Sequence, residues 1–218
     1  MILISPQTAE HLFWIGRYIQ RAESMTRLVI EAFDKIIDND PEESHRFYAK
    51  LGVTLNYQNN HEFLRHAVFD LEYVSLLTIV NNARENAVLA RASLPNRMFS
   101  RINGLYLRYQ IAKDEPKTSI FWLESTLEEL DAIWGNLELN IAHMHEKDLI
   151  QLGRIIEKMD LNIRLFDSLE ATALDVIRLN DLLVKLGQYS KVQLHSSNPL
   201  KTLHTINSVY KTMVAVQE

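Results

Sequence analysis

L-F-W-I-G-R-Y-I-Q-R-A-E-S-M-T-R-L-V-I, residues 12–30, is the stretch that decides the fold of this 218-residue chain. A related segment, L-I-Q-L-G-R-I-I-E-K-M-D-L-N-I-R-L-F-D, follows at residues 149–167. The two align without a gap, with identities at Leu12/Leu149, Gly16/Gly153, Arg17/Arg154, Ile19/Ile156, Arg27/Arg164 and Leu28/Leu165. Three further pairs keep polarity and size: Gln20/Glu157, Arg21/Lys158 and Glu23/Asp160. The sequence therefore predicts two helices that share one pattern of residues.

Apolar residues around the first copy recur at every third or fourth position, which predicts one amphipathic helix over residues 6–38. Ser5 and Pro6 suit its first turn, and Asn39-Asp40-Pro41 ends it. The same periodicity predicts helices over residues 42–51, 61–69, 71–93, 96–113, 116–141, 147–169, 172–187 and 198–216. Gly52 is the expected left-handed cap of the second helix. Five long and several short helices without a credible sheet indicate an all-α helical bundle.

The chain is predicted to form a single domain over residues 1–218, because it contains no linker rich in Pro, Gly or Ser. The two copies are 137 residues apart (154 − 17), much more than the roughly 20 to 50 residues that separate the repeats of a solenoid. Two related positions within one bundle account for this spacing. Residues 143–145 are expected to form a turn, and residues 190–197 a loop.

Composition excludes several classes of function. A net charge of −5 gives no reason to expect nucleic-acid binding, which rewards clustered Lys and Arg. Without cysteine there are no disulfides or thiolate metal sites, and the chain contains no P-loop. No segment resembles a signal peptide or a membrane span. We therefore expect a cytoplasmic protein without metal or other cofactor, and with neither a nucleic-acid nor a membrane partner.

The repeated helices carry a polar stripe. In the first copy Gly16, Gln20, Glu23 and Arg27 lie at i, i+4, i+7 and i+11, on one side of a helix. The second copy places there Gly153, Glu157, Asp160 and Arg164, and beside the stripes lie Arg17, Arg21, Arg154 and Lys158. Glycine at this spacing would let another helix backbone come close. The acid–Arg pairs at i+4, Glu23–Arg27 and Asp160–Arg164, can bridge within each helix. If the stripes face each other, Arg27 and Arg164 could also reach acids of the opposite helix.

Three interpretations of the paired stripes are open. They can form a seam that fixes helix register, since buried ion pairs specify an arrangement more than they stabilise it. They can instead converge on a site for an anionic or peptide-like ligand. A metal site is the third, although Gln20 stands where a dimetal bundle needs a carboxylate, and neither copy has a Glu-x-x-His pair.

A second polar patch interrupts the otherwise apolar helix predicted over residues 71–93. It comprises Asn82, Arg84, Glu85 and Asn86. An amide network that joins helices and a ligand pocket explain it about equally well. His143 and His145 fall in the predicted turn, where we expect solvent exposure rather than metal binding.

The segments T-A-E-H-L-F-W-I-G-R-Y-I-Q-R-A-E-S-M-T-R-L-V (residues 8–29), N-A-R-E-N-A (82–87) and L-G-R-I-I-E-K-M-D-L-N-I-R-L-F-D (152–167) together resemble the bacterial Alpha-E family of helical domains with a Glu-Arg motif. Both copies in that family usually read L-E-R-A-E or L-E-R-A-D. Here they read I-Q-R-A-E and I-E-K-M-D, so each copy keeps one half of the Glu-Arg pair.

The resemblance implies a genomic context. Alpha-E proteins are typically encoded beside a circularly permuted ATP-grasp protein, often with a transglutaminase-like protein. This context suggests an accessory protein of a system for peptide or amide-bond synthesis or turnover, which binds an ATP-grasp-type partner or a peptide-like ligand. The expected binding residues are Arg17, Gln20, Arg21, Glu23, Arg27, Arg84, Glu85, Asn86, Arg154, Glu157, Lys158, Asp160 and Arg164.

An enzyme of the same system is the alternative. It would use Glu157 and Asp160 as acid and base, and clustered arginines to hold a peptide-like or anionic substrate. The two hypotheses differ in what they require of these carboxylates, since a catalytic acid must reach a ligand and a structural one need not.

Overall fold

The computed structural model describes residues 4–38, 40, 42–70, 75–114, 118–139, 144–166, 172–187, 192 and 199–215. Within these ranges the protein is all α-helical, as predicted, without a strand. The helices are α1 (Pro6–Ile37), α2 (Glu42–Lys50), α3 (Asn60–Phe69), α4 (Leu76–Leu89), α5 (Asn96–Asp114), α6 (Ile120–Leu139), α7 (Met144–Phe166), α8 (Ala173–Lys185) and α9 (Pro199–Ala215). A short 3-10 turn, Arg91–Ser93, follows α4. None of these helices is long and apolar enough to cross a membrane.

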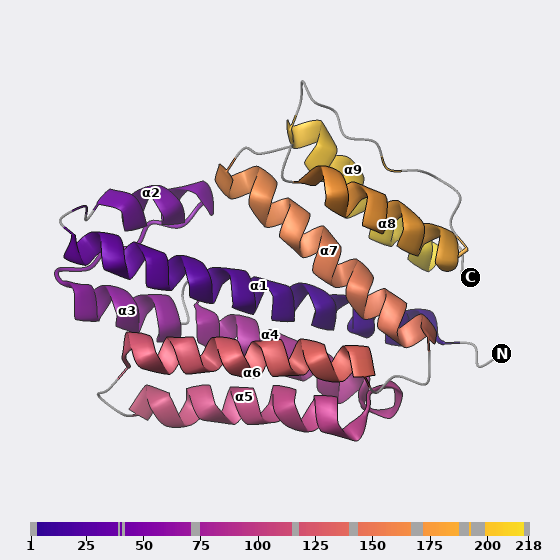
Figure 1. Cartoon of the computed structure of the whole chain (residues 1–218), viewed down its shortest axis with the longest axis horizontal. Coiled ribbons are helices and arrows are strands. Elements are labelled where there is room, and N and C mark those ends of the chain that lie inside the picture. Colours follow the sequence, from indigo (N-terminus) through magenta and orange to yellow (C-terminus); the bar gives the residue numbers. More distant parts are fainter. Residues whose placement is uncertain are drawn as a thin grey trace.

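Helix α1 is the axis of the bundle. It packs most extensively against α7 and α4, and it also contacts α2, α3, α6 and α9. Figure 1 shows α7 crossing α1 obliquely, with α8 and α9 beside α7, whereas α3, α4, α5 and α6 lie along the other side of α1. The two repeated helices, α1 and α7, are therefore packed against each other at the junction of two groups of helices.

The start of α1 follows from its sequence. The Ser5 hydroxyl accepts the Thr8 amide proton at 3.1 Å, and Pro6 occupies the first turn, where its missing N–H costs no hydrogen bond. Apolar residues at helical spacing, such as Leu12, Ile15 and Ile19, are then fully buried. The helix is thus fixed by a local cap at one end and by the core along its length.

Gly52 has the conformation predicted for it. Its φ of 74° lies in the left-handed region, and its amide donates to the Ala49 carbonyl at 2.9 Å just beyond α2. The predicted helix cap is therefore confirmed.

Helix α4 is shorter than the sequence predicted. The expected helix over residues 71–93 begins at Leu76, and residues 71–74 lie outside the described part of the chain. The buried Ser75 caps it, with its hydroxyl accepting from the Thr78 amide at 3.3 Å. At the other end the Ala90 amide donates to the carbonyls of Asn86 and Val88, and the chain tightens into the 3-10 turn. The apolar periodicity continues past the Ser75 cap and into the 3-10 turn, so it does not reveal either end of α4.

Replacement of Ser75 by Ala is expected to destabilise the protein by about 1 kcal/mol, because the first turn of α4 loses its side-chain acceptor in a buried setting. Ser75→Gly is the matched control, since Gly at this position costs only a few tenths of a kcal/mol relative to Ser. Urea denaturation of the three proteins measures the difference. Equal midpoints for Ser75→Ala and the unmodified protein would show that the cap contributes nothing.

The start of α7 was predicted wrongly. Met144 and His145 belong to its first turn rather than to a turn between helices, and His143 lies outside the described residues. The predicted helix ends at residues 116, 141, 169, 198 and 216 and the predicted loop over residues 190–197 also fall outside the described residues, apart from Val192.

Candidate functional site

The crossing of α1 and α7 is built on the two repeated glycines. A Cβ atom placed on Gly16 would lie 2.0 Å from the Ile150 carbonyl oxygen. One placed on Gly153 would lie 2.0 Å from the Phe13 carbonyl oxygen. Each glycine therefore receives the backbone of the opposite helix, and the close approach predicted from the stripe is confirmed. The contacts are reciprocal, so the internal repeat is a two-fold-like relation between the helices.

Glu157 lies beside this crossing and joins the helices electrostatically. Its carboxylate accepts from Arg17 Nε at 2.6 Å and from Arg21 Nε at 2.5 Å, so each oxygen receives one guanidinium. The residue is completely buried. Burial of the Arg21 guanidinium would by itself lower its pKa, but the charge and hydrogen bond of Glu157 outweigh burial, and the pKa is raised. The retained arginine of the first copy thus pairs with the retained glutamate of the second.

The equivalent position on the other side of the crossing is neutral. Arg154 Nε donates to Gln20 Oε1 at 3.1 Å, which mirrors the bond from Arg17 to Glu157. The Arg154 guanidinium also lies over the Trp134 ring, 4.0 Å from its centroid. Burial lowers the pKa of Arg154, and nearby acids only partly oppose this. The change from a carboxylate to Gln20 therefore leaves one half of the crossing without its central anion.

Of the two arrangements predicted for Arg27 and Arg164, the bridge within each helix is confirmed, and the contact with an acid of the opposite helix is wrong. Arg164 Nε donates to Asp160, at 2.8 Å, and Arg27 Nη2 donates to Glu23, at 3.2 Å, each within its own helix. Two of the arginines that cross between the helices, Arg17 and Arg154, stand one residue after each glycine, and the third, Arg21, lies one turn beyond Arg17 on the same side of α1. The outermost arginines lie too far from the crossing and bond to acids one turn away.

Other helices complete both halves of the crossing. In one half Asn207 of α9 accepts from Arg17 Nη1 at 3.0 Å and donates to Asp160 Oδ1 at 2.8 Å. In the other, Trp134 of α6 donates to Glu23 Oε2 at 2.9 Å. Neither residue was among the predicted site residues, since no local pattern marks a single amide or indole as a partner of a distant arginine.

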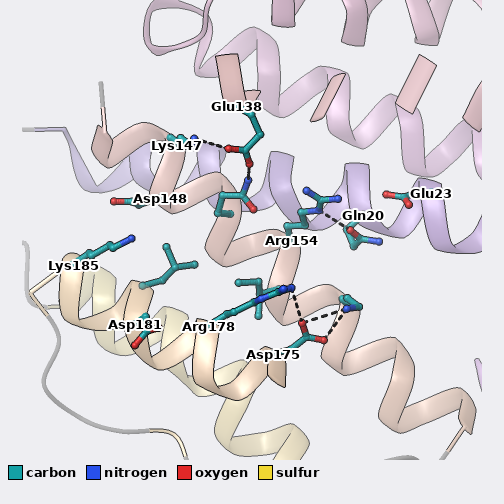
Figure 2. A pocket seen from close by; sticks show the side chains of 14 residues that line it. Gln20, Glu23, Glu138, Lys147, Asp148, Arg154, Asp175, Arg178, Asp181 and Lys185 are labelled. Atoms are coloured by element: carbon teal, nitrogen blue, oxygen red, sulfur yellow. Dashed lines mark hydrogen bonds and ion pairs between the residues drawn. The ribbon is translucent and has the colours of Figure 1, made fainter. Parts of the chain in front are cut away.

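A charged cleft of about 560 Å³ lies on the Gln20 side, lined from α1, α6, α7 and α8. Figure 2 shows its side chains. Lys158 Nζ pairs with Asp175 Oδ2 at 2.9 Å. Lys147 Nζ pairs with Glu138 Oε2 at 2.6 Å (Figure 2). The cations that line this α7–α8 cleft are Lys147, Arg154, Lys158, Arg178 and Lys185. The carboxylates are Glu23, Glu138, Asp148, Asp175 and Asp181, so its charges balance.

A second cavity, which we call the Arg21 pocket, lies on the Glu157 side and has a volume of about 580 Å³. Its polar lining consists of Arg17, Arg21, Lys50, Asp160, Arg164 and Asn207. The end of α2 and the side chains of Met25 and Leu161 provide the remaining wall. The crossing therefore has a cavity on each side, and both have a volume ordinary for ligand pockets in proteins.

The polar patch of α4 joins helices. His11 Nδ1 of α1 lies 3.0 Å from Asn86 Oδ1, and Asn86 Nδ2 donates to the Asn82 carbonyl at 2.8 Å. Arg84 Nε donates to Asn103 Oδ1 of α5 at 3.2 Å, and Arg84 Nη1 donates to the adjacent Glu85 at 2.6 Å. These bonds match the interpretation as an interhelical network. No hydrogen bond or ion pair among the described residues connects this patch to Glu157 or to its partners Arg17 and Arg21.

The described residues contain no group of three or more His, Asp or Glu side chains placed to hold a metal ion. The described residues place guanidinium, ammonium, carboxylate and amide groups around the crossing, and such groups bind charged and peptide-like molecules by hydrogen bonds and ion pairs.

A family model for a predicted alpha-helical domain with a conserved ER motif matches residues 4–202. The match spans both repeated helices and most of the other described helices. No curated protein and no solved structure matches the chain.

Proposed function

The chain belongs to the Alpha-E family, and we propose that it is an accessory helical protein that binds a partner protein or peptide without catalysing a reaction. The proposed partner is an ATP-grasp-type protein in a bacterial, cytoplasmic system for peptide or amide-bond synthesis or turnover. The partner class rests on the family resemblance. The binding role rests on the geometry of the α1–α7 crossing.

The state of Glu157 is the observation that carries this proposal. A general acid or base must come within hydrogen-bonding distance of its substrate, directly or through a water molecule. Glu157 is completely buried, and both of its oxygens are occupied by arginines from the opposite helix. The carboxylate with the strongest claim to a catalytic role thus serves to hold α1 against α7.

The surroundings of the crossing support binding. Cavities of about 560 Å³ and 580 Å³ flank it, and their rims carry charged side chains that reach solvent. The side chains of Lys158 and Arg164 are 46% and 49% exposed, so each can meet a ligand without first leaving the core. A fixed crossing with accessible charges at its edges suits recognition of a peptide or a protein surface.

Asp160 favours an enzyme as the second candidate function. It lines the Arg21 pocket together with Arg17, Arg21 and Arg164, an arrangement in which an acid stands beside groups able to hold an anionic substrate. Against this role, Asp160 is only 4% exposed and already accepts from Arg164 and Asn207. An exchange of this carboxylate for an amide separates the two candidates.

The test is co-expression with the ATP-grasp-type protein encoded in the same genome, followed by size-exclusion chromatography and an assay of amide-bond formation. We expect a stable complex, and Asp160→Asn should leave the rate of amide-bond formation by the saturated complex within about twofold, because no proton passes through this residue. Catalysis by Asp160 would instead cost about 10² to 10⁴ in rate.

Gly104→Ala, a change on an open helix surface, is the control for the effects of substitution itself. Circular dichroism checks that Asp160→Asn is folded. Absence of a complex would contradict the proposed partner, and a folded Asp160→Asn variant with a hundredfold loss of activity would contradict the accessory role.

A further inference from the structure

The two cavities beside the α1–α7 crossing differ in charge. The α7–α8 cleft has five cations and five carboxylates on its lining. Among the described residues of the Arg21 pocket, the four cations Arg17, Arg21, Lys50 and Arg164 face only Asp160 on the wall and Glu157 behind it. This leaves an excess of two positive charges in a protein whose net charge is −5. The Arg21 pocket, unlike the cleft, therefore attracts an anion.

The arginines of this pocket are oriented before any ligand arrives. Arg17 and Arg21 each use Nε to bind Glu157, and Arg17 Nη1 binds Asn207. None of the described residues accepts a hydrogen bond from the terminal nitrogens of Arg21. Because a guanidinium is planar, a fixed Nε also fixes the direction of these remaining donors. Binding of a ligand to these donors therefore costs little side-chain conformational entropy.

Lys50 and Arg164 provide further donors at the more exposed side. Lys50 Nζ donates to the Leu165 carbonyl at the end of α7, and none of the described residues accepts a hydrogen bond from its other two N–H groups. Arg164 directs Nε and Nη2 to Asp160, and its side chain is 49% exposed. The donors thus come from α1, α2 and α7, on different sides of one cavity.

The same cavity offers a place for the neutral part of a ligand. Met25, Leu51 and Leu161 contribute apolar wall, and Asp160 and Asn207 carry acceptor oxygens. A bare oxyanion would use only the cations. A carboxylate attached to a peptide uses the cations, the apolar wall and the acceptors, the last for its amide N–H groups.

We propose that the Arg21 pocket binds the carboxylate of an acidic peptide, with Arg21, Lys50 and Arg164 as the principal donors. This inference rests on the proposed binding role, whose ligand class it specifies, and it does not depend on an ATP-grasp partner. The source of the oxyanion can be tested, because inorganic phosphate offers the same charge without a peptide.

The experiment is isothermal titration of the isolated protein with acetyl-Gly-Glu-Glu, with the uncharged acetyl-Gly-Gln-Gln-amide and with inorganic phosphate. We expect saturable binding of the acidic peptide that weakens as salt is added, and at least tenfold weaker binding of the other two. Binding of phosphate but not of the acidic peptide would overturn the proposal, as would binding of neither.

Variants locate the site. Lys50→Gln and Arg164→Gln are each expected to weaken the acidic peptide about tenfold, since each removes one charge-assisted hydrogen bond. Arg178→Gln, in the α7–α8 cleft with a side chain 69% exposed, is the matched control and should leave the affinity within twofold. Loss of affinity in Arg178→Gln alone would place the ligand in the cleft and overturn the assignment.

Both pocket variants alter exposed side chains, so folding is expected to persist and is checked by thermal melting. If the titration fails but the complex with the ATP-grasp-type protein still forms, the proposed ligand class is wrong and the proposed partner is retained. Failure of the complex with a successful titration would instead contradict the partner and retain the peptide site.

Discussion

Leucine in place of Gly16 or Gly153 is expected to unfold the protein or leave it barely stable. A Cβ atom at Gly16 would stand 2.0 Å from the Ile150 carbonyl oxygen and 3.0 Å from the Arg154 amide nitrogen. Both obstacles are backbone of α7, which cannot rotate away as a side chain can. Overpacking in a core costs about 1 to 3 kcal/mol and occasionally more, and here α1 and α7 would have to separate along the main interface of the bundle. We therefore expect a loss of at least about 3 kcal/mol, a large share of the roughly 5 to 15 kcal/mol by which domains are stable.

The chain contains a matched control for this substitution. Gly104 in α5 and Gly135 in α6 are helical glycines, and a Cβ atom added to either would have no neighbouring atom within 4 Å. Alanine at either site should stabilise the protein by about 0.5 to 1 kcal/mol, because alanine favours the helix and nothing obstructs it. Thermal melts of the four single variants measure both effects. Melting temperatures of Gly16→Leu and Gly153→Leu close to that of the unmodified protein would refute the role of the glycines.

Much of the fold could be predicted because its causes are local or periodic. Apolar spacing marks the long helices, and Ser5, Pro6 and Gly52 mark ends that depend on neighbouring residues only. The facing of α1 and α7 was also accessible, because the repeated glycines at equivalent positions imply the same close contact from either helix. A glycine that occurs at the same position in both copies of a repeat predicts the contact from each helix independently.

The site was less predictable because its geometry is tertiary. Arg21 bonds to Glu157 and Arg154 bonds to Gln20 across the crossing. Arg27 and Arg164 form the predicted i+4 bridges but do not reach the opposite helix, since helix periodicity gives the face of a residue and not its distance from a crossing. Asn207, Trp134, Asp175 and Lys50 come from four other helices. Their roles depend on how those helices are packed, which no short motif records.

Comparison of the two halves explains why the altered residues matter. Glu157 faces two arginines and is their main counter-charge, whereas Gln20 faces Arg154, which Trp134 also covers. Lys158, which replaces the second arginine of the motif, turns away from Gln20 to Asp175 of α8. On the side where Gln20 replaces the acid, Lys158 thus pairs with Asp175 of α8 instead. The charged groups of both halves are therefore paired, although with different partners.

Glu157→Gln is expected to destabilise the protein by about 3 to 5 kcal/mol, although glutamine has nearly the same shape. The change leaves Arg17, only 8% exposed, and Arg21 beside a neutral amide. Loss of one partner from a buried ion pair is costly because the remaining charge stays desolvated. The amide also presents an N–H group to one of the two guanidinium donors, so one of the bonds at 2.6 Å and 2.5 Å must break.

Glu129→Gln is the matched control, because Glu129 forms one ion pair, 3.0 Å from Arg101, and its side chain is 42% exposed. Exposed pairs contribute about 0 to 1 kcal/mol, so this variant should unfold at nearly the same urea concentration as the unmodified protein. The comparison holds the chemical change constant, whereas Glu157 differs from Glu129 in being buried and in pairing with two arginines rather than one. If Glu157→Gln lowered the free energy of unfolding no more than Glu129→Gln does, Glu157 would not hold α1 against α7. The inference that its carboxylate is structural rather than catalytic would then lose its basis.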